Sequence, residues 1–226
     1  MRITARNWFR DLAASALLVV AGLLVHTLAL ADPPPQVRVT TNMGEFVIEL
    51  NPDRAPLTVA NFIRYVKEGF YSNTLIHRVV ANFVIQGGGH SASDLKLKPV
   101  HEPVNNEAGN GLQNKRGTVG LARGESAHSG NAQFYVNLVD NPDLDPLPTR
   151  WGYAVFGKVV QGMDVIDRIG VTPTGASGPF KSDTPLKPVI IEKIDLIDAA
   201  AQAATNPAPV AKPLAPPAPD AILSPK

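Results

Sequence analysis

Apolar and polar residues alternate along two neighbouring segments, 37–41 and 46–50. Each segment places Val, Thr, Phe, Ile or Leu at every second position, which is the period of a strand with one buried face. The tripeptide Asn42-Met43-Gly44 lies between them and supplies residues that favour a turn. The pattern therefore predicts a β-hairpin over residues 37–50.

The spacing changes to that of a helix after the hairpin. The sequence Pro56-Leu57-Thr58 is typical of a helix start, with Thr58 as the expected N-cap. Apolar residues at 62, 63 and 66 share one face, and Gly69 is expected to end the helix. A second helix is expected over 163–169, where apolar residues again cluster at helical spacing.

Short β-rich segments separated by Gly, Asn and Pro fill the region between these helices. Strands are expected over 118–122, 133–138 and 154–160, and two more within 71–88. Many short strands with two helices predict a mainly β fold that closes as an antiparallel barrel.

The first 31 residues differ in character from the rest. Three arginines among residues 2–10 precede an apolar run over 12–30, which ends in Ala29-Leu30-Ala31. A basic start, an apolar middle and small residues at the end are typical of a secretory signal peptide over residues 1–31. The alternative is an uncleaved membrane anchor, because the run is nearly long enough to span a bilayer. Both interpretations place the following domain outside the cytoplasm, and the periplasm is the expected compartment.

Composition narrows the chemistry further. The chain of 226 residues contains no cysteine, which excludes disulfides, thiol nucleophiles and cysteine-bound metals. Its formal net charge of +1 gives no reason to expect nucleic-acid binding. Five histidines show no metal-type spacing, so no metal site is expected. Residues 36–198 are expected to form the folded domain, and the Ala/Pro-rich residues 199–226 a disordered tail, which is inert or else a spacer or partner-binding segment.

The candidate chemistry lies within residues 71–88. Arg78, Phe83 and Gln86 are spaced so that a cation, an apolar ring and an amide would share one surface, which suits a neutral, polarisable group such as a peptide bond. The alternative is that Arg78 only pairs with a carboxylate. His77 is expected to have a structural role, and the triplet 87–89 to form a turn, because it lacks the Lys and Ser/Thr of a phosphate-binding loop.

Three blocks of the chain resemble the cyclophilin signature, in the family's order. They are residues 71–88, residues 117–137 and residues 152–164. The first departs from the pattern at Ile76, where Phe is usual. The resemblance implies a closed antiparallel eight-stranded barrel capped by two α-helices. It also implies peptidyl-prolyl cis-trans isomerase activity without a cofactor. The third block, with Tyr153, resembles the bacterial periplasmic branch of the family.

The resemblance also implies roles for individual residues. The catalytic positions match Arg78, Gln86 and Phe83. The substrate-binding positions match Val84, Ala122, Arg123, Gln133, Tyr135, Leu144 and Tyr153. Tyr135 stands where Phe is usual, Tyr153 where many members have His, and Asp143 where some have Trp. The loop 141–151 is longer than in the cytosolic branch, and Trp151 at its end is an alternative source of the missing indole.

The expected function is rotation about X–Pro bonds in support of the folding of exported proteins. The expected partners are proline-containing exported polypeptides that are unfolded or partly folded. No nucleic-acid partner is expected. The protein is expected to contact a membrane only through residues 1–31, if these stay uncleaved. It is expected to be a monomer. The alternative is a proline-peptide-binding chaperone with little turnover, because a fold does not guarantee an activity.

Overall fold

The computed structural model describes residues 33–198, and the predictions for residues 1–31 and 199–226 lie outside this range. Ten strands and two α-helices are found in the described part of the chain. The strands are β1 (Gln36–Thr41), β2 (Gly44–Leu50), β3 (Thr74–Val80), β4 (Val84–Ser91), β5 (Thr118–Leu121), β6 (Phe134–Asn137), β7 (Val155–Gln161), β8 (Thr174–Ser177), β9 (Phe180–Pro185) and β10 (Val189–Ile197). The helices are α2 (Pro56–Lys67), α3 (Met163–Gly170) and the short 3₁₀ helix η1 (Pro142–Leu144).

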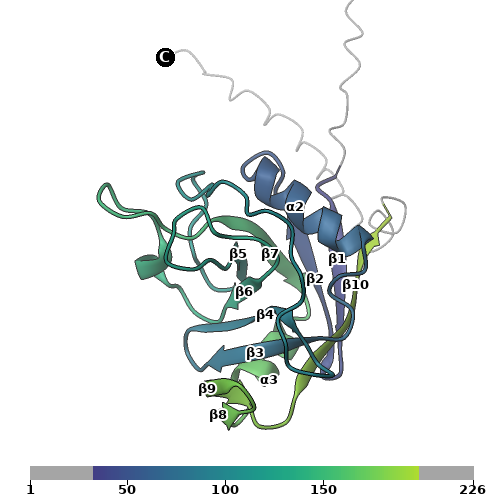
Figure 1. The fold of residues 1–226 in the computed structure, drawn as a ribbon. Helices are drawn as coiled ribbons and strands as arrows, with labels where there is room; N and C mark the ends of the chain where they lie inside the picture. The colour runs from purple at the N-terminus through teal and green to yellow at the C-terminus, as the bar shows by residue number, and fades with distance from the viewer. Residues whose placement is uncertain (1–32, 199–226) are drawn as a thin grey trace, which may run out of the picture. The chain divides into compact units, whose positions relative to one another are not determined.

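Eight strands close into one antiparallel barrel in the order β1-β10-β3-β4-β6-β5-β7-β2. Closure leaves no barrel strand with an unpaired edge. Figure 1 shows α2 and α3 at opposite ends of this barrel. The predicted mainly β barrel with two helices is therefore confirmed.

The first hairpin has the register that the alternation requires. Thr41 pairs with Gly44 across the two-residue turn, and Val39 pairs with Phe46 further along the strands. Val39, Phe46 and Ile48 are all almost fully buried. The apolar face of the hairpin therefore forms part of the barrel core, as the sequence predicts.

Helix α2 begins differently from the expectation, and the prediction of Thr58 as N-cap is wrong. Pro56 is the first helical residue, Ala55 is the N-cap, and Thr58 lies inside the first turn. The carboxylate of Glu107 caps the helix instead, accepting bonds from the backbone nitrogens of Leu57 (3.0 Å) and Thr58 (2.8 Å). A Glu 49 residues away supplies both the acceptor and the negative charge that a helix N-terminus favours.

Aromatic side chains fill the space between α2 and the barrel. Phe62 of α2 has its ring centroid 5.2 Å from Tyr71, 5.6 Å from Phe134 and 5.2 Å from Phe156. All four residues are buried. Tilted and edge-on aromatic pairs at these distances add to the stabilisation that area burial provides, and they fix α2 against the strands that carry the pocket described below.

The triplet Gly87-Gly88-Gly89 does not form the expected turn. All three residues lie within β4, where Gly88 has φ +84° and the β3–β4 pairing is irregular next to Gly87. A Cβ on Gly88 would lie 2.9 Å from the ring of Tyr71. Glycine is therefore needed at this position for a kink within the strand. The local sequence alone had indicated a turn, because three consecutive glycines are typical of one.

A second, two-stranded sheet of β8 and β9 lies outside the barrel order. Figure 1 shows this hairpin beside α3 and the end of β3. The sequence analysis did not predict it. Its short strands are largely exposed and lack the alternation that made the first hairpin recognisable. In residues 33–198, no helix has the length and hydropathy needed to cross a membrane.

Candidate active site

One row of residues crosses four neighbouring strands and forms the base of a pocket. Arg78 of β3 pairs with Gln86 of β4, Gln86 pairs with Tyr135 of β6, and Tyr135 pairs with Gly120 of β5. Residues paired in this way point to the same face of a sheet. The strand register alone therefore brings together side chains that are up to 57 positions apart in the sequence.

The polar side of the pocket is a chain of hydrogen bonds. A guanidinium nitrogen of Arg78 donates to Gln86 Oε1 at 3.3 Å, and Gln86 Nε2 donates to Gln133 Oε1 at 3.1 Å. Arg78 also lies over the ring of Phe83, 5.8 Å from its centroid. No carboxylate in residues 33–198 forms an ion pair with Arg78, which argues against the purely structural alternative. The remaining guanidinium donors point to a substrate-binding role.

The pocket has a volume of about 290 Å³. Nine of the ten predicted site residues line it: Arg78, Phe83, Val84, Gln86, Ala122, Arg123, Tyr135, Leu144 and Tyr153. The tenth, Gln133, contacts the site through its bond to Gln86. The structure thus brings all ten together, while their contacts with a substrate stay a prediction.

Tyr135 forms one wall and is held by an acceptor that the sequence analysis missed. Its hydroxyl donates to Asn114 Oδ1 at 2.6 Å, and both residues are buried. A Cβ at position 120 would lie 2.2 Å from the Tyr135 hydroxyl, so only glycine there leaves room for the ring. Burial, with Tyr153 and Asp145 nearby, raises the pKa of Tyr135 well above its usual 10, and the hydroxyl remains a donor.

Asn114 also connects the pocket to the long loop 141–151. Asp145 Oδ1 accepts bonds from both the backbone nitrogen and the side-chain amide of Asn114, each at 2.8 Å. Asn141 Nδ2 donates to the carbonyl of Phe83 at 3.0 Å, which attaches the start of the loop to the pocket floor. The loop that carries Leu144 is therefore held by partly buried polar contacts. A lone Asn or Asp in an irregular segment gives no periodic signal, so local sequence could not indicate them.

Arg123 and Tyr153 form the opposite rim. The guanidinium of Arg123 lies 4.4 Å from the centroid of the Tyr153 ring, a cation–π geometry. The same guanidinium donates to the carbonyls of Gly124 (2.9 Å), Trp151 (3.0 Å) and Gly152 (3.3 Å). These bonds fix the rim in place and use most of the donors of Arg123.

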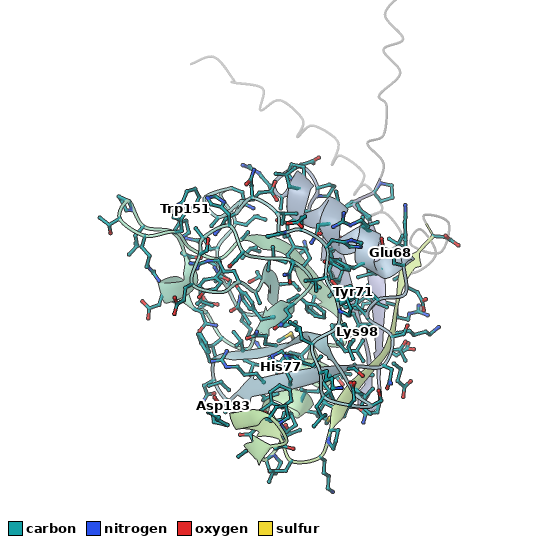
Figure 2. The ribbon with its side chains drawn as sticks, in the orientation of Figure 1. Glu68, Tyr71, His77, Lys98, Trp151 and Asp183 are labelled. Atoms are coloured by element: carbon teal, nitrogen blue, oxygen red, sulfur yellow. The ribbon has the colours of Figure 1, made fainter. Side chains whose placement is uncertain are left out.

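Neither candidate for the tryptophan position reaches the pocket. Asp143 is exposed in η1 and is absent from the lining, although its neighbour Leu144 is part of it. Trp151 is half exposed and packs its ring 5.0 Å from that of His128. Figure 2 shows Trp151 at the upper left of the described domain and His77 near its lower centre. The pocket accordingly has no indole on its rim.

His77 lies next to Arg78 but faces away from the pocket. Its ring packs 4.6 Å from that of His90 and 5.5 Å from Phe180 of the β8–β9 hairpin, and its Nδ1 has no hydrogen-bond partner. Burial, followed by the nearby His90 and Arg78, lowers the pKa of His77 from 6.5 to about 4. The neutral, packed ring fits the structural role expected of it. No group of three His, Cys, Asp or Glu within residues 33–198 is arranged to bind a metal.

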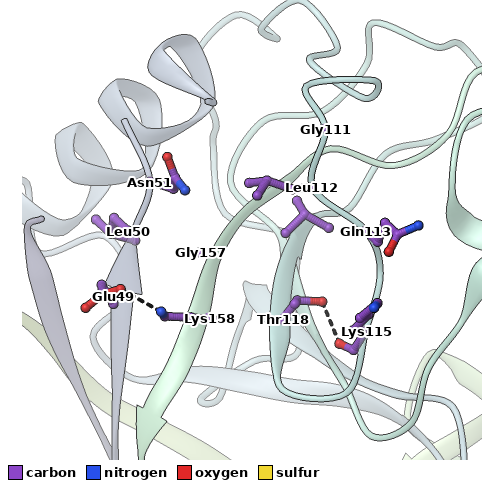
Figure 3. Close-up of a pocket in the computed structure, with 11 residues that line it drawn as sticks. Glu49, Leu50, Asn51, Gly111, Leu112, Gln113, Lys115, Thr118, Gly157 and Lys158 are labelled. Atoms are coloured by element: carbon purple, nitrogen blue, oxygen red, sulfur yellow. Dashed lines mark hydrogen bonds and ion pairs between the residues drawn. The ribbon is translucent and has the colours of Figure 1, made fainter. Parts of the chain in front are cut away.

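A second pocket of about 360 Å³ lies between β2, β7 and the loop around residue 112. Figure 3 shows Leu50 and Leu112 on either side of Gly157, with the Glu49–Lys158 ion pair (3.0 Å) at one rim. None of the ten predicted site residues lines this pocket. It is larger, but none of its lysines is hydrogen-bonded to a side-chain amide as Arg78 is to Gln86, so the chemistry favours the Arg78 pocket.

Comparison with known proteins agrees with this geometry. Residues 36–196 match the family model described as cyclophilin type peptidyl-prolyl cis-trans isomerase/CLD. The chain belongs to the cyclophilin family. A protein of Escherichia coli named peptidyl-prolyl cis-trans isomerase B is 49% identical over 157 residues, which cover 68% of this chain and 94% of that protein. Peptidyl-prolyl cis-trans isomerase A of Dickeya dadantii is 42% identical over 184 residues, covering 81% and 96%.

Solved cyclophilins share the fold. A cyclophilin type isomerase of Cryptosporidium parvum superposes with a TM-score of 0.61 at 24% identity, covering 73% of this chain and 98% of that one. The same protein solved in the presence of the dipeptide Ala-Pro gives a TM-score of 0.59, covering 72% and 99%. The family model and the named relatives show that the chain is a cyclophilin-type peptidyl-prolyl cis-trans isomerase.

Proposed function

We propose that this cyclophilin isomerises X–Pro bonds of exported polypeptides in the pocket beside Arg78. The observation that carries the proposal is a cation hydrogen-bonded to an amide, Arg78 to Gln86, at the edge of an apolar pocket floor of Phe83 and Val84. Proline is the substrate group that combines an apolar ring with a polar amide. Dipeptide Ala-Pro was present with the related Cryptosporidium protein, which supports the same ligand class here.

The pocket supplies what this reaction lacks in water. Rotation about an amide bond has a barrier of about 18–20 kcal/mol because of resonance, and exchange at X–Pro bonds takes tens to hundreds of seconds. No bond is broken, so the enzyme must hold the ring and weaken the resonance. Phe83, Val84, Tyr135 and Leu144 would hold the proline ring. An apolar surrounding favours the twisted amide, in which charge is less separated.

Arg78 would act on the amide itself. As the amide twists, its nitrogen becomes a hydrogen-bond acceptor, and the guanidinium is placed to donate either to this nitrogen or to the carbonyl. Gln86 would keep Arg78 in position through the 3.3 Å bond, with Gln133 supporting Gln86 in turn. Donors that are fixed before the reaction gain most as charge develops. Ala122, Arg123 and Tyr153 would contact the backbone of the peptide along the rim.

The proposed clients are proline-containing exported polypeptides that are unfolded or partly folded, and the proposed compartment is the periplasm. Two features of the sequence support this proposal. Residues 1–31 have the pattern of a signal peptide, and the block that contains Tyr153 resembles the periplasmic branch of the family. The protein is proposed to act as a monomer. N-terminal sequencing of protein from the native host tests the export step, with a mature start at Asp32 as the expected result. An intact start in the membrane fraction would instead support a membrane anchor.

A protease-coupled or NMR exchange assay on an Ala-Pro peptide tests the site. Arg78→Ala is expected to lower kcat/KM by about 10²–10³, by analogy with the loss of one preorganised donor. Circular dichroism should stay unchanged, because Arg78 is half-buried and packs outside the core. Activity within threefold of the unsubstituted chain would contradict the proposed role of Arg78.

The alternative, a proline-peptide-binding chaperone with little turnover, needs the apolar floor but not Arg78. The same variant separates the two functions. A chaperone would keep its protection of an aggregating client after Arg78→Ala, whereas the isomerase would lose its effect on folding rate.

A further inference from the structure

The loop between β6 and β7 carries exposed apolar side chains close to the Arg78 pocket. Leu147 is 55% exposed and Trp151 is 50% exposed. Together with Pro146 and Pro148 they line a hollow of about 370 Å³, called the loop hollow below. Figure 1 shows this loop reaching outward from the barrel. Exposed apolar side chains that lie together are a mark of surfaces that bind another molecule.

The base of the same loop belongs to the Arg78 pocket. The backbone nitrogen of Tyr153 donates to the carbonyl of Leu144 at 2.9 Å, and both side chains line that pocket. Nearer the tip, Leu147 and Arg150 exchange two backbone hydrogen bonds of 2.9 and 3.1 Å. One hairpin-like segment therefore connects the pocket, at its base, with the loop hollow, at its tip.

We propose that the loop hollow binds an apolar side chain of the client polypeptide whose proline lies in the Arg78 pocket. This inference rests on the proposed function and names a further part of its substrate. Leu147 lies three residues from Leu144, which at about 3.4 Å per residue separates the two by up to about 10 Å. An extended client covers the same distance with three residues. The favoured client therefore has an apolar or aromatic side chain about three residues from its proline.

The loop hollow is held in place before a client binds. The guanidinium of Arg123 donates to the carbonyl of Trp151 at 3.0 Å, and that of Arg150 donates to the carbonyl of Asp145 at 3.2 Å. Prolines on both sides of Leu147 restrict the backbone further. A surface that is fixed in advance loses little conformational entropy on binding, so burial of its apolar groups contributes directly to affinity.

Continuity with the active site favours a client over other occupants. The proposed path of the client backbone follows the rim formed by Arg123 and Tyr153, and Arg123 is bonded directly to the backbone of Trp151. Val171 and Leu186 are at least as exposed as the two apolar residues of the loop hollow. They follow Tyr153, the last residue of the pocket lining, by 18 and 33 positions, and neither lines the pocket.

Peptides with one central Ala-Pro bond in a Ser/Gly background test the inference. A single Phe is placed at successive positions before or after the proline, and NMR exchange measurements give KM and kcat for each peptide. Phe three residues from the proline, on one side, is expected to lower KM about tenfold relative to Ser, with kcat unchanged. Phe closer to or further from the proline should lower KM less.

Substitutions in the chain then locate the effect. Leu147→Ser should remove most of the gain from Phe, whereas Leu186→Ser, at a similarly exposed leucine, is the matched control and should keep it. Trp151→Ala should reduce the gain several-fold, with thermal unfolding as a check because the Trp151 ring packs against His128. The peptide Ala-Ala-Pro-Ala is too short to reach the loop hollow, so both Ser variants should isomerise it as fast as the unsubstituted chain.

Three outcomes would overturn the inference. The first is a KM that does not depend on the position of Phe, in a chain that isomerises Ala-Ala-Pro-Ala normally. The second is a gain from Phe that Leu147→Ser leaves unchanged. The third is a dimer at the assay concentration that Leu147→Ser dissociates, because the loop hollow would then bind a second copy of the chain. Failure on Ala-Ala-Pro-Ala as well would instead refute the proposed function.

Discussion

Replacing Asn114 by Ala should destabilise the domain and weaken substrate binding together. Asn114 Oδ1 accepts a hydrogen bond from the Tyr135 hydroxyl, and Asn114 Nδ2 donates one to Asp145 Oδ1. The Ala variant leaves the Tyr135 hydroxyl buried without an acceptor, which costs about 1–3 kcal/mol, and removes a charge-assisted bond worth about 1.5 kcal/mol or more. The backbone bond from residue 114 to Asp145 survives. The expected loss of unfolding free energy is therefore about 2.5–4.5 kcal/mol.

Tyr135→Phe is the matched variant, because it removes the hydroxyl that Asn114→Ala would leave unsatisfied. The oxygen of Asn114 keeps its second donor, Asn137 Nδ2 at 3.2 Å, so the Phe variant alone should cost about 0.5–1.5 kcal/mol. The double variant should be more stable than the sum of the two losses predicts, by about 1–2 kcal/mol. Urea unfolding measures all four free energies.

The reasoning would be refuted by either of two results. The first is an Asn114→Ala variant within 0.5 kcal/mol of the unsubstituted chain, since a buried hydroxyl cannot be orphaned so cheaply. The second is strict additivity in the double variant. Kinetics adds an independent test. KM for an Ala-Pro peptide should rise about tenfold in Asn114→Ala while kcat changes little, because Arg78 and Gln86 lie on β3 and β4, whereas Asn114 lies in the irregular segment before β5.

Three further outcomes are expected. Glu107→Gln should lower the unfolding free energy by about 1–2 kcal/mol without changing activity, because it weakens the cap of α2; exposed Glu102→Gln is the control, and equal melting points of the two would contradict the capping role. The folded state holds His77 at a pKa of about 4, below its usual 6.5, so its contribution to the unfolding free energy should be complete above about pH 6.5 and fall by about 3 kcal/mol as the pH drops to 4. Chemical unfolding at several pH values should show a smaller loss in His77→Phe. An identical pH profile in that variant would contradict the role of His77. Cyclosporin, titrated against activity, should inhibit about a hundredfold more weakly than it inhibits family members with a rim tryptophan, since Asp143 and Trp151 leave no indole there; nanomolar inhibition would refute this.

The sequence predicted those features whose signal is local and periodic. The hairpin over β1 and β2 and the apolar face of α2 follow from alternation and helical spacing, since each repeats over several residues. The Arg78 pocket followed from a motif in which most of the residues lie on two adjacent strands, β3 and β4. Their grouping in space then needs only a correct strand register.

Features that depend on contacts between distant segments could not be predicted. Glu107 caps α2 across 49 residues, and nothing in its neighbourhood distinguishes it from other acidic residues. Thr58 carries the local signal of an N-cap but lies in the first turn, because Pro56 already provides the fixed φ of a first helical residue. Asn114 was missed for the same reason as Glu107, since its partners Tyr135 and Asp145 come from other segments.

The hydrogen bonds around Asn114 connect two departures from the family pattern, Tyr135 and Tyr153. A phenol at position 135 in place of Phe requires an acceptor inside the wall, which Asn114 supplies, and space for the ring, which Gly120 supplies. Asn114 in turn bonds to Asp145 of the long loop, whose carbonyl at Leu144 accepts the backbone nitrogen of Tyr153 at 2.9 Å.

The pocket therefore has two supports of different physical kind. Arg78, Phe83 and Gln86 lie on β3, β4 and the turn between them, so apolar core packing and strand register hold them. Leu144 and Tyr153 depend on partly buried hydrogen bonds through Asn114, and bonds of one network are lost together when one member is removed. Changes in the loop should accordingly act on KM and on client preference, whereas changes in β3 and β4 act on kcat. A long loop of this kind lets the client range vary while the rotation chemistry stays the same.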